Sequence, residues 1–581
     1  MGKRQQIGRR RFLARVPAAV VAGVTLPPLT STVARAAGTV SAQPQDTTRT
    51  LSTDALKSAE QVSGLTFTNG EEEMALAGVK GNLESYERLR RLDIPLDTEP
   101  AVTFRPYLPG TRPGGRATRN RPLRVAPRAT IRVTSRLEDL AFQPVGTLAA
   151  LIRSRKITSG DLTRMYLARL KKYGEPLHCV VTLTEELAIA QAANADRDLR
   201  RGRYRGALHG IPWGAKDLFA TRGIRTTWGA TPYEHQILDV DATVVERLRE
   251  AGAVLVAKLS MGSLAQGGVW FGGTTRNPWK PDTGSSGSSA GPAAATSAGL
   301  VGFALGSETR GSIITPSSIC GVVGLRPTYG RVSRYGAMAL SWTMDKVGPL
   351  CRSVEDCALV LNAIYGSDGH DETVVDAPFV WKPDAPMSKL RIGFIASEFA
   401  GSLANPAAGS NLLKDALELL KKSGARLEPI EMPDFPASAI NFILSAEAAA
   451  AFDDLTRSRG IDQLTAQGAG DWPNSFRTSR FIPAVEYIRA QRARTLLIQK
   501  MDALMSKYDV FLAPARGSAS LPITNLTGHP AVCLKNGFVD GLPQALMITG
   551  RLYDEATVLR VALAYERSTN WKKMHPDLRG L

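Results

Sequence analysis

One lysine and two serines of this 581-residue chain have the types and surroundings that nucleophilic catalysis without a histidine requires. Ser312 lies in a Gly-flanked turn, GSETRGSI at residues 306–313, directly after an apolar run at residues 300–305. Such a turn can present a hydroxyl and several backbone N–H groups to one point, and those donors can stabilise the charge that a nucleophilic attack creates. Ser288 and Lys216 lie upstream, and together the three side chains predict a Lys–Ser–Ser set that cuts a bond.

Lys216 lies in GIPWGAKD, residues 210–217, between the apolar side chains of Trp213 and Leu218. A lone lysine is usually a solvated surface residue. A lysine in an apolar turn can instead be buried, and burial disfavours its charged form. Because a neutral lysine can accept the proton that a serine must lose to become a nucleophile, Lys216 is a candidate general base in such a turn.

A Gly/Ser-rich stretch, DTGSSGSSAG at residues 282–291, surrounds Ser288. Its composition alone is that of a flexible linker. Residues 292–299 directly after it are nevertheless a good helix start, with Pro292 near the first turn. A loop that runs into a helix offers aligned N–H donors and hydroxyls, so a flexible linker and a structured hydroxyl or anion site are equally supported.

The same stretch contains a formal G-x-S-x-G motif with Ser289 at its centre. In an α/β-hydrolase Ser289 would be the nucleophile, and His529 could be the base. That motif requires a buried strand directly before it, and residues 277–283, NPWKPDT, cannot form one. The context therefore excludes the α/β-hydrolase interpretation.

Histidines and cysteines show no pattern of a metal site. None of the six histidines has metal-ligand spacing with another, so each is expected to be a surface or structural residue. The five cysteines are odd in number and fit no zinc or disulfide framework. Cys351 and Cys357 could pair after export, and otherwise the cysteines are expected to be buried small apolar residues.

Together these segments resemble the amidase signature family over roughly residues 137–566. The matching segments stand here as GIPWGAKD (210–217), GSSAGPAAA (287–295), GSETRGSI (306–313), CGVVGLRPTYGRVS (320–333), SVED (353–356), NLTGHPA (525–531) and GLP (541–543). The resemblance implies a large mixed β-sheet sandwiched between helices, and it implies no metal and no organic cofactor.

By this resemblance, Ser312 is the nucleophile, Ser288 is the serine that relays a proton, and Lys216 is the general base. The family holds the relay serine after a cis peptide bond, so we expect a cis Gly287–Ser288 bond. The oxyanion hole is expected to be formed by the backbone N–H groups of Thr309, Arg310, Gly311 and Ser312.

The sequence departs from the family in two places. The family usually has two glycines before the nucleophile, whereas this chain has Arg310 and Gly311. A backbone amide does not depend on its side chain, so the oxyanion hole survives if Arg310 adopts the required conformation, but an arginine at φ > 0 would be strained. Ala290 and Pro292 replace a glycine and a serine of the family's Gly/Ser segment, and neither departure touches the three catalytic side chains.

The resemblance predicts an amidohydrolase that cleaves a carboxamide through an acyl-enzyme and releases a carboxylate and ammonia or an amine. The substrate would be a small-molecule amide or a peptide amide. Trp213, Trp270, Phe271 and Trp342 lie near the matching segments and could bind a bulky apolar acyl group or pack in the core. The family includes the A subunit of glutamyl-tRNA amidotransferase, whose signature region is similar, but a stand-alone amidase fits an exported protein better. An esterase with the same triad and a non-catalytic amidase-like binding protein remain open alternatives.

Residues 1–36 are predicted to be a twin-arginine signal peptide. RRRFL at residues 9–13 is the twin-arginine motif, residues 16–29 are moderately apolar, and residues 34–36, ARA, offer a cleavage site. The apolar stretch is too short and too rich in proline to span a membrane, so no stable membrane anchor is expected. We therefore expect the twin-arginine export machinery to carry the folded protein to the periplasm or the medium. Removing the seven basic residues of this segment lowers the formal charge from +18 to +11.

Residues 37–136 are predicted to be a helical extension followed by a basic linker. Residues 69–92 have glutamates at their start and arginines at their end, which suits a helix dipole. Residues 112–136 contain eight arginines and no acid. No aromatic residue lies between them to stack on bases, so a solvated linker is favoured over an anionic-surface site, and no nucleic-acid partner is expected.

Residues 137–576 are the predicted amidase domain, of the α/β class. Helix-like segments alternate with short apolar runs, which predicts a sheet covered by helices on both faces. The apolar runs that predict strands are residues 253–257, 301–305, 322–325, 390–395, 510–513 and 545–548. Residues 432–506 are predicted to be mostly helical, and they could cap a pocket or cover the sheet.

Overall fold

The computed structural model describes residues 51–94, 101–102, 136–403 and 410–581. For residues 401–403 and 410 it describes the backbone and not the side chains. Residues 51–581 form one compact unit. The predicted signal peptide, and all but the last residue of the predicted basic linker, lie outside the described residues. Their assignment therefore stays a prediction.

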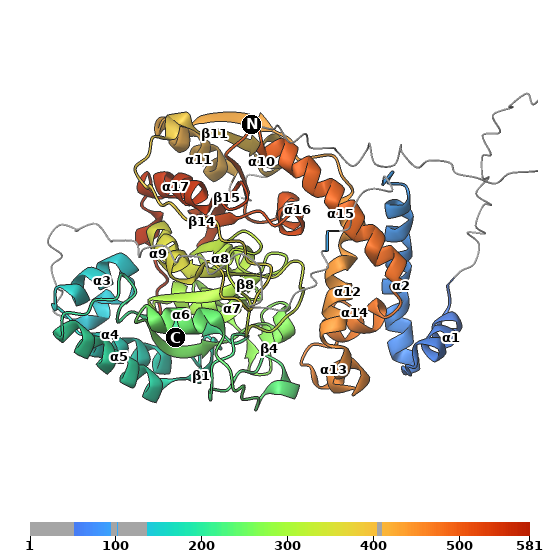
Figure 1. The fold of residues 1–581 in the computed structure, drawn as a ribbon, viewed down its shortest axis with the longest axis horizontal. Coiled ribbons are helices and arrows are strands. Elements are labelled where there is room, and N and C mark those ends of the chain that lie inside the picture. The colour runs from blue at the N-terminus through green and yellow to red at the C-terminus, as the bar shows by residue number, and fades with distance from the viewer. Residues whose placement is uncertain (1–50, 95–100, 103–135, 404–409) are drawn as a thin grey trace, which may run out of the picture. The chain divides into compact units, whose positions relative to one another are not determined.

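A large sheet is the centre of the fold, and Figure 1 labels its strands β1, β8, β11, β14 and β15. The sheet has 11 strands in the order β1-β3-β2-β8-β10-β9-β14-β15-β13-β11-β12. β2 pairs in parallel with β3 and β8, and β11 pairs in parallel with β12 and β13, whereas the other neighbours are antiparallel. The predicted large mixed sheet is thus confirmed. The strands are β1 (Val180–Leu183), β2 (Pro212–Lys216), β3 (Val254–Leu259), β8 (Phe303–Glu308), β9 (Val323–Arg326), β10 (Lys346–Cys351), β11 (Arg391–Ile395), β12 (Arg426–Ile430), β13 (Val510–Pro514), β14 (Ala531–Val539) and β15 (Leu542–Gly550).

Both faces of the sheet are buried, because successive residues of each central strand point to opposite faces. In β15, Leu546 and Ile548 belong to one hydrophobic cluster, and Met547 between them belongs to another. In β14, Val532 faces the first cluster and Cys533 the second. The short apolar runs of the sequence are therefore strands that are covered on both sides.

Helices cover the two faces. α9 and α17 contribute to the first cluster, where α9 contacts β10 and α17 contacts β14 and β15. α7 contacts β8, and α8 contacts β9, β14 and β15. α4 and α5 both contact β3. The helices of this part are α3 (Val145–Arg153), α4 (Ser159–Tyr173), α5 (Glu185–Arg200), α6 (Thr243–Glu250), α7 (Ala290–Ser297), α8 (Ile314–Cys320), α9 (Val354–Ile364), α10 (Ala396–Leu403), α11 (Ser410–Lys422), α16 (Ser520–Leu526) and α17 (Glu555–Arg567).

Residues 432–506 are mostly helical, as predicted, with helices between residues 437 and 505. They form η7 (Ala437–Ile440), α12 (Phe442–Ala451), α13 (Asp453–Arg457), η8 (Gly460–Gln463), α14 (Trp472–Ser479) and α15 (Ala484–Met505). The buried Glu447 of α12 joins this group to the loop before β10, because it accepts hydrogen bonds from Ser341 Oγ, Thr343 N and Thr343 Oγ1 (3.1 and 2.7 Å for Thr343).

The N-terminal extension contains two helices, α1 (Thr53–Ser63) and α2 (Asn69–Arg90), which confirms the helix predicted over residues 69–92. Thr68 begins α2 with a capping box in which its side chain and that of Glu71 exchange hydrogen bonds with the backbone. α2 lies beside α14 (Figure 1) and also contacts η7. Its Tyr86 and Leu89 are buried in the second hydrophobic cluster. The extension is thus part of the folded unit.

Two expectations from the sequence need correction. Lys216 does not lie in a turn but ends strand β2, whose five residues are all buried. Its neighbours β3 and β8 bury it, although its own segment contains Pro212 and Gly214. The five cysteines are buried and free, so Cys351 and Cys357 form no disulfide.

In the described residues, none of the helices has the length and apolar character needed to cross a membrane.

Candidate active site

Lys216 lies at the C-terminal end of β2 and is fully buried. Burial lowers the pKa of its ammonium group from 10.5 to about 7, although the carboxylates of Asp345 and Glu308 act in the opposite direction. Close to neutral pH a large share of this side chain is therefore an uncharged amine, which can accept a proton.

The Lys216 amine contacts two serine hydroxyls. Its Nζ donates hydrogen bonds to Ser288 Oγ at 2.8 Å and to Ser307 Oγ at 2.9 Å. The peptide bond between Gly287 and Ser288 is cis, as expected. The structure therefore brings together Lys216 and Ser288, and it adds Ser307 of β8, which the sequence did not indicate.

The Gly/Ser stretch around Ser288 is a structured loop and not a flexible linker. Ser288 O accepts a hydrogen bond from Gly262 N at 3.2 Å, and Ser285 N donates to Thr275 O at 2.9 Å. A Cβ atom at Gly287 would lie 1.7 Å from Gly267 O, so a glycine is required there. Of the two interpretations left open by composition, the structured site is correct.

Ser289 is held by the main chain of β8. Its Oγ donates to Ser307 O at 3.1 Å and accepts from Ser307 N at 3.2 Å. The residues before it do form a strand, β7 (Lys280–Gly284), but β7 pairs only with the two-residue β6 (Arg276–Asn277) and none of its residues is fully buried. The buried strand of an α/β-hydrolase elbow is thus absent from this part of the described chain, and the Ser289 hydroxyl serves the fold.

Ser312 follows β8 in the turn that leads to α8 and is partly exposed. Its carbonyl oxygen accepts a hydrogen bond from Ser289 N at 3.1 Å, which places the turn beside the loop that carries Ser288. In the described part of the chain, no group hydrogen-bonds the Ser312 hydroxyl. Its oxygen is therefore available to a substrate.

The turn before Ser312 presents backbone N–H groups that have no acceptor. Among the described residues, no carbonyl or side chain accepts from the N–H groups of residues 309–312. The next two N–H groups, of Ile313 and Ile314, both donate to Glu308 Oε2 at 2.8 Å. Residues 309–312 are thus the part of this turn that can donate to an oxyanion.

Arg310 does not strain this turn. The positive φ lies one residue later, at Gly311, with a value of 129°. Arg310 is absent from the residues with positive φ. The second glycine of the family is therefore not needed for the backbone conformation at position 310.

Glu308 fixes the C-terminal end of this turn, where it accepts hydrogen bonds from Ile313 N and Ile314 N. It is fully buried, and its Oε1 accepts from Arg326 Nη1 at 2.9 Å and from Asn525 Nδ2 at 2.8 Å. Burial raises the pKa of this carboxyl, but Arg326 and the hydrogen bonds outweigh burial, so its pKa lies below the usual value and it stays ionised. The only sequence feature that could have indicated this structural role of Glu308 is an acidic residue four positions before Ser312.

Thr309 is held by two neighbouring residues at the start of β10. Its Oγ1 donates to Asp345 Oδ1 at 2.6 Å, and Lys346 Nζ donates to Thr309 O at 3.5 Å. Asp345 also accepts from the N–H groups of Leu340 and Ser341, at 2.8 and 2.9 Å. Asp345 therefore fixes both the first residue of the turn and the loop before β10.

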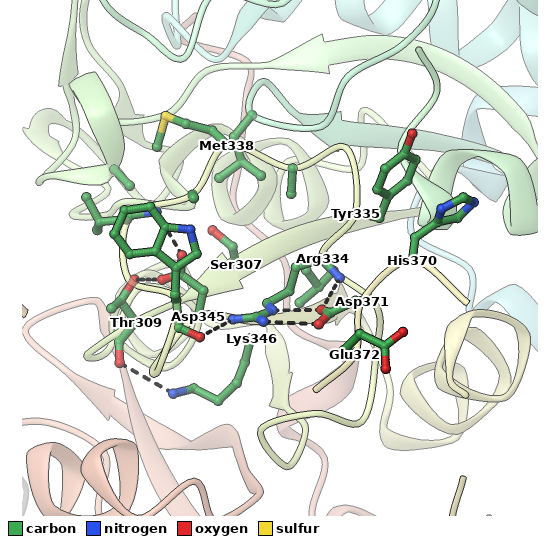
Figure 2. A pocket seen from close by; sticks show the side chains of 17 residues that line it. Ser307, Thr309, Arg334, Tyr335, Met338, Asp345, Lys346, His370, Asp371 and Glu372 are labelled. Atoms are coloured by element: carbon green, nitrogen blue, oxygen red, sulfur yellow. Dashed lines mark hydrogen bonds and ion pairs between the residues drawn. The ribbon is translucent and has the colours of Figure 1, made fainter. Parts of the chain in front are cut away.

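A cavity of about 370 Å³ lies against Ser307 and Thr309 (Figure 2). Arg334 and Asp371 form an ion pair at its far end, at 2.8 Å, where the rings of Tyr335 and His370 also stack. The apolar wall of this cavity consists of Leu218, Ala337, Met338, Leu340, Trp342 and Val347. Because Ser307 also contacts Lys216, the cavity adjoins the candidate catalytic residues.

The four aromatic residues considered from the sequence have different places. Trp213 is 1% exposed and stacks on Phe303 in the core. Trp270 is buried and packs edge-on against Phe271. Trp342 is 49% exposed, and of the four it alone lines this cavity. An apolar substrate group can therefore meet Trp342.

No histidine of the described chain contacts the candidate catalytic side chains. In the described residues, none of the six hydrogen-bonds Lys216, Ser288 or Ser312. His529 is buried, its Nδ1 shares a hydrogen bond with Thr527 Oγ1 at 2.8 Å, and burial lowers its pKa to about 3. His529 is therefore a neutral structural residue and not the base of a serine triad.

A family model described as "Amidase" matches residues 161–524, more than half of the chain. The chain is 35% identical to the A subunit of glutamyl-tRNA(Gln) amidotransferase from Geobacillus kaustophilus, over 75% of this chain and 99% of that protein. It is 36% identical to the corresponding protein of Lysinibacillus sphaericus, over 74% of this chain and 97% of the relative.

Solved structures agree with the fold. The peptide amidase of Stenotrophomonas maltophilia superposes with a TM-score of 0.67 at 29% identity, over 76% of this chain and 100% of that enzyme. About a quarter of the chain is left without a counterpart in these proteins.

Proposed function

This chain belongs to the amidase signature family, and from that premise we propose that it is a stand-alone amidase that hydrolyses a linear carboxamide through an acyl-enzyme. The observation that carries the proposal is the buried Lys216 amine, which lies 2.8 Å from Ser288 Oγ and has a pKa of about 7. A neutral amine in hydrogen-bond contact with a serine hydroxyl is the arrangement that general-base activation of a nucleophile requires.

In the proposed acylation step, Ser312 Oγ attacks the carbonyl carbon of the amide. Its proton moves to Ser288 Oγ while the Ser288 proton moves to Lys216 Nζ, so Lys216 becomes an ammonium ion. The free N–H groups of residues 309–312 donate to the oxyanion. Collapse of this intermediate breaks the C–N bond, and the proton returns from Lys216 through Ser288 to the leaving ammonia or amine.

Deacylation reverses the proton path with water in place of the amine. Lys216 and Ser288 accept a proton as water attacks the ester of Ser312, and they return it to Ser312 Oγ as the carboxylate leaves. Ser307 Oγ, 2.9 Å from Lys216 Nζ, keeps the amine in place during both steps. No residue in this sequence of steps needs a metal or an organic cofactor.

A primary amide or a peptide amide is the proposed substrate class. The name peptide amidase belongs to the structural neighbour from Stenotrophomonas, and a cavity with an apolar wall next to Ser307 suits an acyl group of that kind. The relatives named as amidotransferase subunits favour a second role, in which ammonia passes to another protein. Hydrolysis of an amide by this chain alone, without added subunits, separates the two.

We also propose that the protein is exported through the twin-arginine route, which rests on the RRRFL motif at residues 9–13. An exported enzyme has no access to cytoplasmic tRNA, which supports the stand-alone role. Replacing Arg9, Arg10 and Arg11 by lysine should retain the protein in the cytoplasm, as cell fractionation would show. Equal amounts of both forms outside the cytoplasm would contradict this proposal.

A fluorophosphonate probe tests the catalytic assignment. We expect the adduct on Ser312, loss of labelling in Ser312→Ala and Lys216→Ala, and unchanged labelling in Ser289→Ala and His529→Gln. An adduct on Ser289, or no adduct at all, would remove the proposed triad and favour a binding protein. Rates on a matched amide and ester pair decide whether the enzyme is an amidase or an esterase.

A further inference from the structure

A second cavity, of about 430 Å³, adjoins the one beside Ser307. The two cavities share four lining residues, Ala337, Met338, Ala339 and Trp342. The loop before β10 therefore separates the cavity beside Ser307 from the second cavity and lines both of them. Each volume falls within the range of roughly 300–1,000 Å³ that small-molecule sites occupy.

Aromatic and aliphatic side chains form the second cavity. The Trp228 and Tyr233 rings lie 4.6 Å apart, and the Trp228 and Phe452 rings lie 6.3 Å apart. The aliphatic lining residues are Leu238, Val240 and Leu455. Phe452 and Leu455 come from the helical segment at 437–505, so this segment does line a pocket, as one interpretation of the sequence held. The composition suits an aromatic ring that packs against other rings.

Trp228, which lines this cavity, carries a polar group. Its indole Nε1 is buried and has no hydrogen-bond partner in the described residues. A buried donor without an acceptor is costly, so the acceptor is expected to come from a ligand. Trp228 also has a φ of 53°, in the left-handed region that bulky residues avoid.

The backbone of Trp228 is tied to the catalytic strand. Trp228 N donates to Asp217 O at 3.3 Å, and Asp217 directly follows Lys216. Asp217 is itself fixed by a buried ion pair with Lys258 at 3.0 Å. The position of Trp228 is therefore set relative to the residues that would perform the chemistry.

One charge stands at the edge of the second cavity. Asp454 lines the cavity, is exposed, and has no ion-pair partner among the described side chains. It lies near Tyr233, whose pKa is raised by burial and by the Asp454 carboxylate. A cationic group of a ligand is favoured at this edge, and an anionic group is disfavoured.

We propose that the second cavity is a substrate subsite for an aromatic side chain of an amidated peptide. A backbone carbonyl of the peptide accepts the hydrogen bond of Trp228 Nε1, and its protonated N-terminal amine lies near Asp454. The substrate extends from the cavity beside Ser307 across Trp342 into the second cavity. This inference rests on the proposed amidase function, but binding can be measured without hydrolysis.

The test uses the full-length Ser312→Ala protein and two amidated tripeptides, one with phenylalanine and one with alanine at the N-terminal position. Burial of the ring predicts roughly 10- to 100-fold tighter binding of the phenylalanine peptide, measured by calorimetry. N-acetylation of that peptide, and Asp454→Asn in the protein, should each weaken binding about two- to fivefold and should not act additively.

Trp228→Phe keeps a ring and removes the N–H donor. We expect about five- to tenfold weaker binding of the phenylalanine peptide and unchanged binding of alaninamide, which is too short to reach the subsite. Trp571→Phe is the matched control, because Trp571 packs on Phe538 and lines neither cavity, and it should change neither affinity. If Trp228→Phe fails to fold, Asp454→Asn tests the same subsite through its second polar contact, at an exposed position.

Equal affinity for the two tripeptides would overturn the subsite, and so would a Trp228→Phe effect of equal size on alaninamide. The two proposals fail in different ways. Hydrolysis of tripeptide amides without preference for phenylalanine leaves the amidase and removes the subsite. Selective binding without hydrolysis of any amide by the wild-type protein leaves the subsite and removes the amidase.

Discussion

The pKa of Lys216 gives the sharpest prediction of the proposed mechanism. Burial lowers this pKa from 10.5 to about 7, a difference of free energy of about 5 kcal/mol between the charged and neutral forms. At pH 7 about half of the enzyme would hold a neutral Lys216, against roughly one molecule in 3,000 for an ordinary lysine. In the proposed mechanism the neutral amine is the active form, so activity is expected to rise with pH.

The assay is the pH profile of kcat/KM for a neutral amide substrate between pH 5 and 10. We expect a single acidic limb centred near pH 7, an increase of about 50-fold from pH 5 to pH 7, and a plateau above pH 8. His370→Gln is the control, because His370 lines the cavity but, in the described structure, forms no hydrogen bond with Lys216 or Ser288. The limb should be unchanged in that variant.

Asp345→Asn moves the limb in a known direction. The Asp345 carboxylate raises the pKa of Lys216, so its removal should shift the limb to lower pH. The variant also loses the acceptor of the Thr309 hydroxyl and is expected to be slower, but the position of the limb does not depend on the plateau rate. A limb near pH 10, a flat profile, or a shift to higher pH would refute the assignment of Lys216 as the base.

Stability provides a second readout of the same pKa. Because the folded pKa lies below the unfolded one, the native state binds fewer protons between pH 7 and 10, and wild-type stability rises with pH in that window. Lys216→Met lacks this term. The stability of the wild type relative to Lys216→Met should therefore increase by about 3–4 kcal/mol from pH 7 to pH 10, as denaturant unfolding would measure. A constant difference would contradict a depressed pKa.

Three further predictions concern the turn and the extension. Gly311→Ala should lower kcat at least about 100-fold with little change in KM, because φ at this position is 129°. Arg310→Gly should change kcat less than about threefold. Equal effects of the two substitutions in steady-state kinetics would contradict the geometry of the turn. Glu308→Gln should lower the free energy of unfolding by about 3–5 kcal/mol, since it leaves the buried Arg326 charge unpaired, and a loss below 1 kcal/mol in denaturant titration would refute this. Leu89→Ala should cost about 2–5 kcal/mol if α2 belongs to the folded unit, and an unchanged unfolding midpoint would show that α2 is not needed.

Local sequence patterns predicted the parts of the fold that depend on local physics. The short apolar runs at residues 390–395 and 510–513 are strands, because a run of that length without polar alternation needs burial on both faces. The helix over residues 69–92 was recognisable from its charges, which the capping box and the last-turn arginines confirm. The cis bond before Ser288 followed from the family resemblance, not from residue chemistry.

The missed features depend on strand pairing over long sequence distances. β2 contains a proline, a glycine and a lysine in five residues, and no local pattern marks it as a buried strand. Its burial comes from β3 and β8, which lie about 40 and 90 residues further along the chain. Ser307 meets Lys216 only because β8 pairs with β2 in one particular register, and that register cannot be read from either segment.

The backbone conformation at Arg310 likewise could not be predicted from the local sequence. Counting glycines located the departure from the family correctly, but it could not say which of the two positions needs a positive φ. The answer depends on how the turn leaves β8, where Glu308 holds the N–H groups of Ile313 and Ile314 and thereby sets the path of the four residues between. The position with a positive φ is Gly311, and this chain retains the glycine there.

The proposed catalytic residues and the proposed subsite consist of different side chains. Lys216, Ser288 and the turn at residues 309–312 are held by β2, β8, and the loop before α7. The second cavity is formed by residues 220–240 after β2, the loop before β10, and residues 451–455 at the junction of α12 and α13. Substitutions at Trp228 or Asp454 can therefore change which amide binds without changing the pKa of Lys216. Such variants should keep the acidic limb near pH 7 while their KM values for long and short amides diverge, and a shifted limb would show that the two parts are coupled.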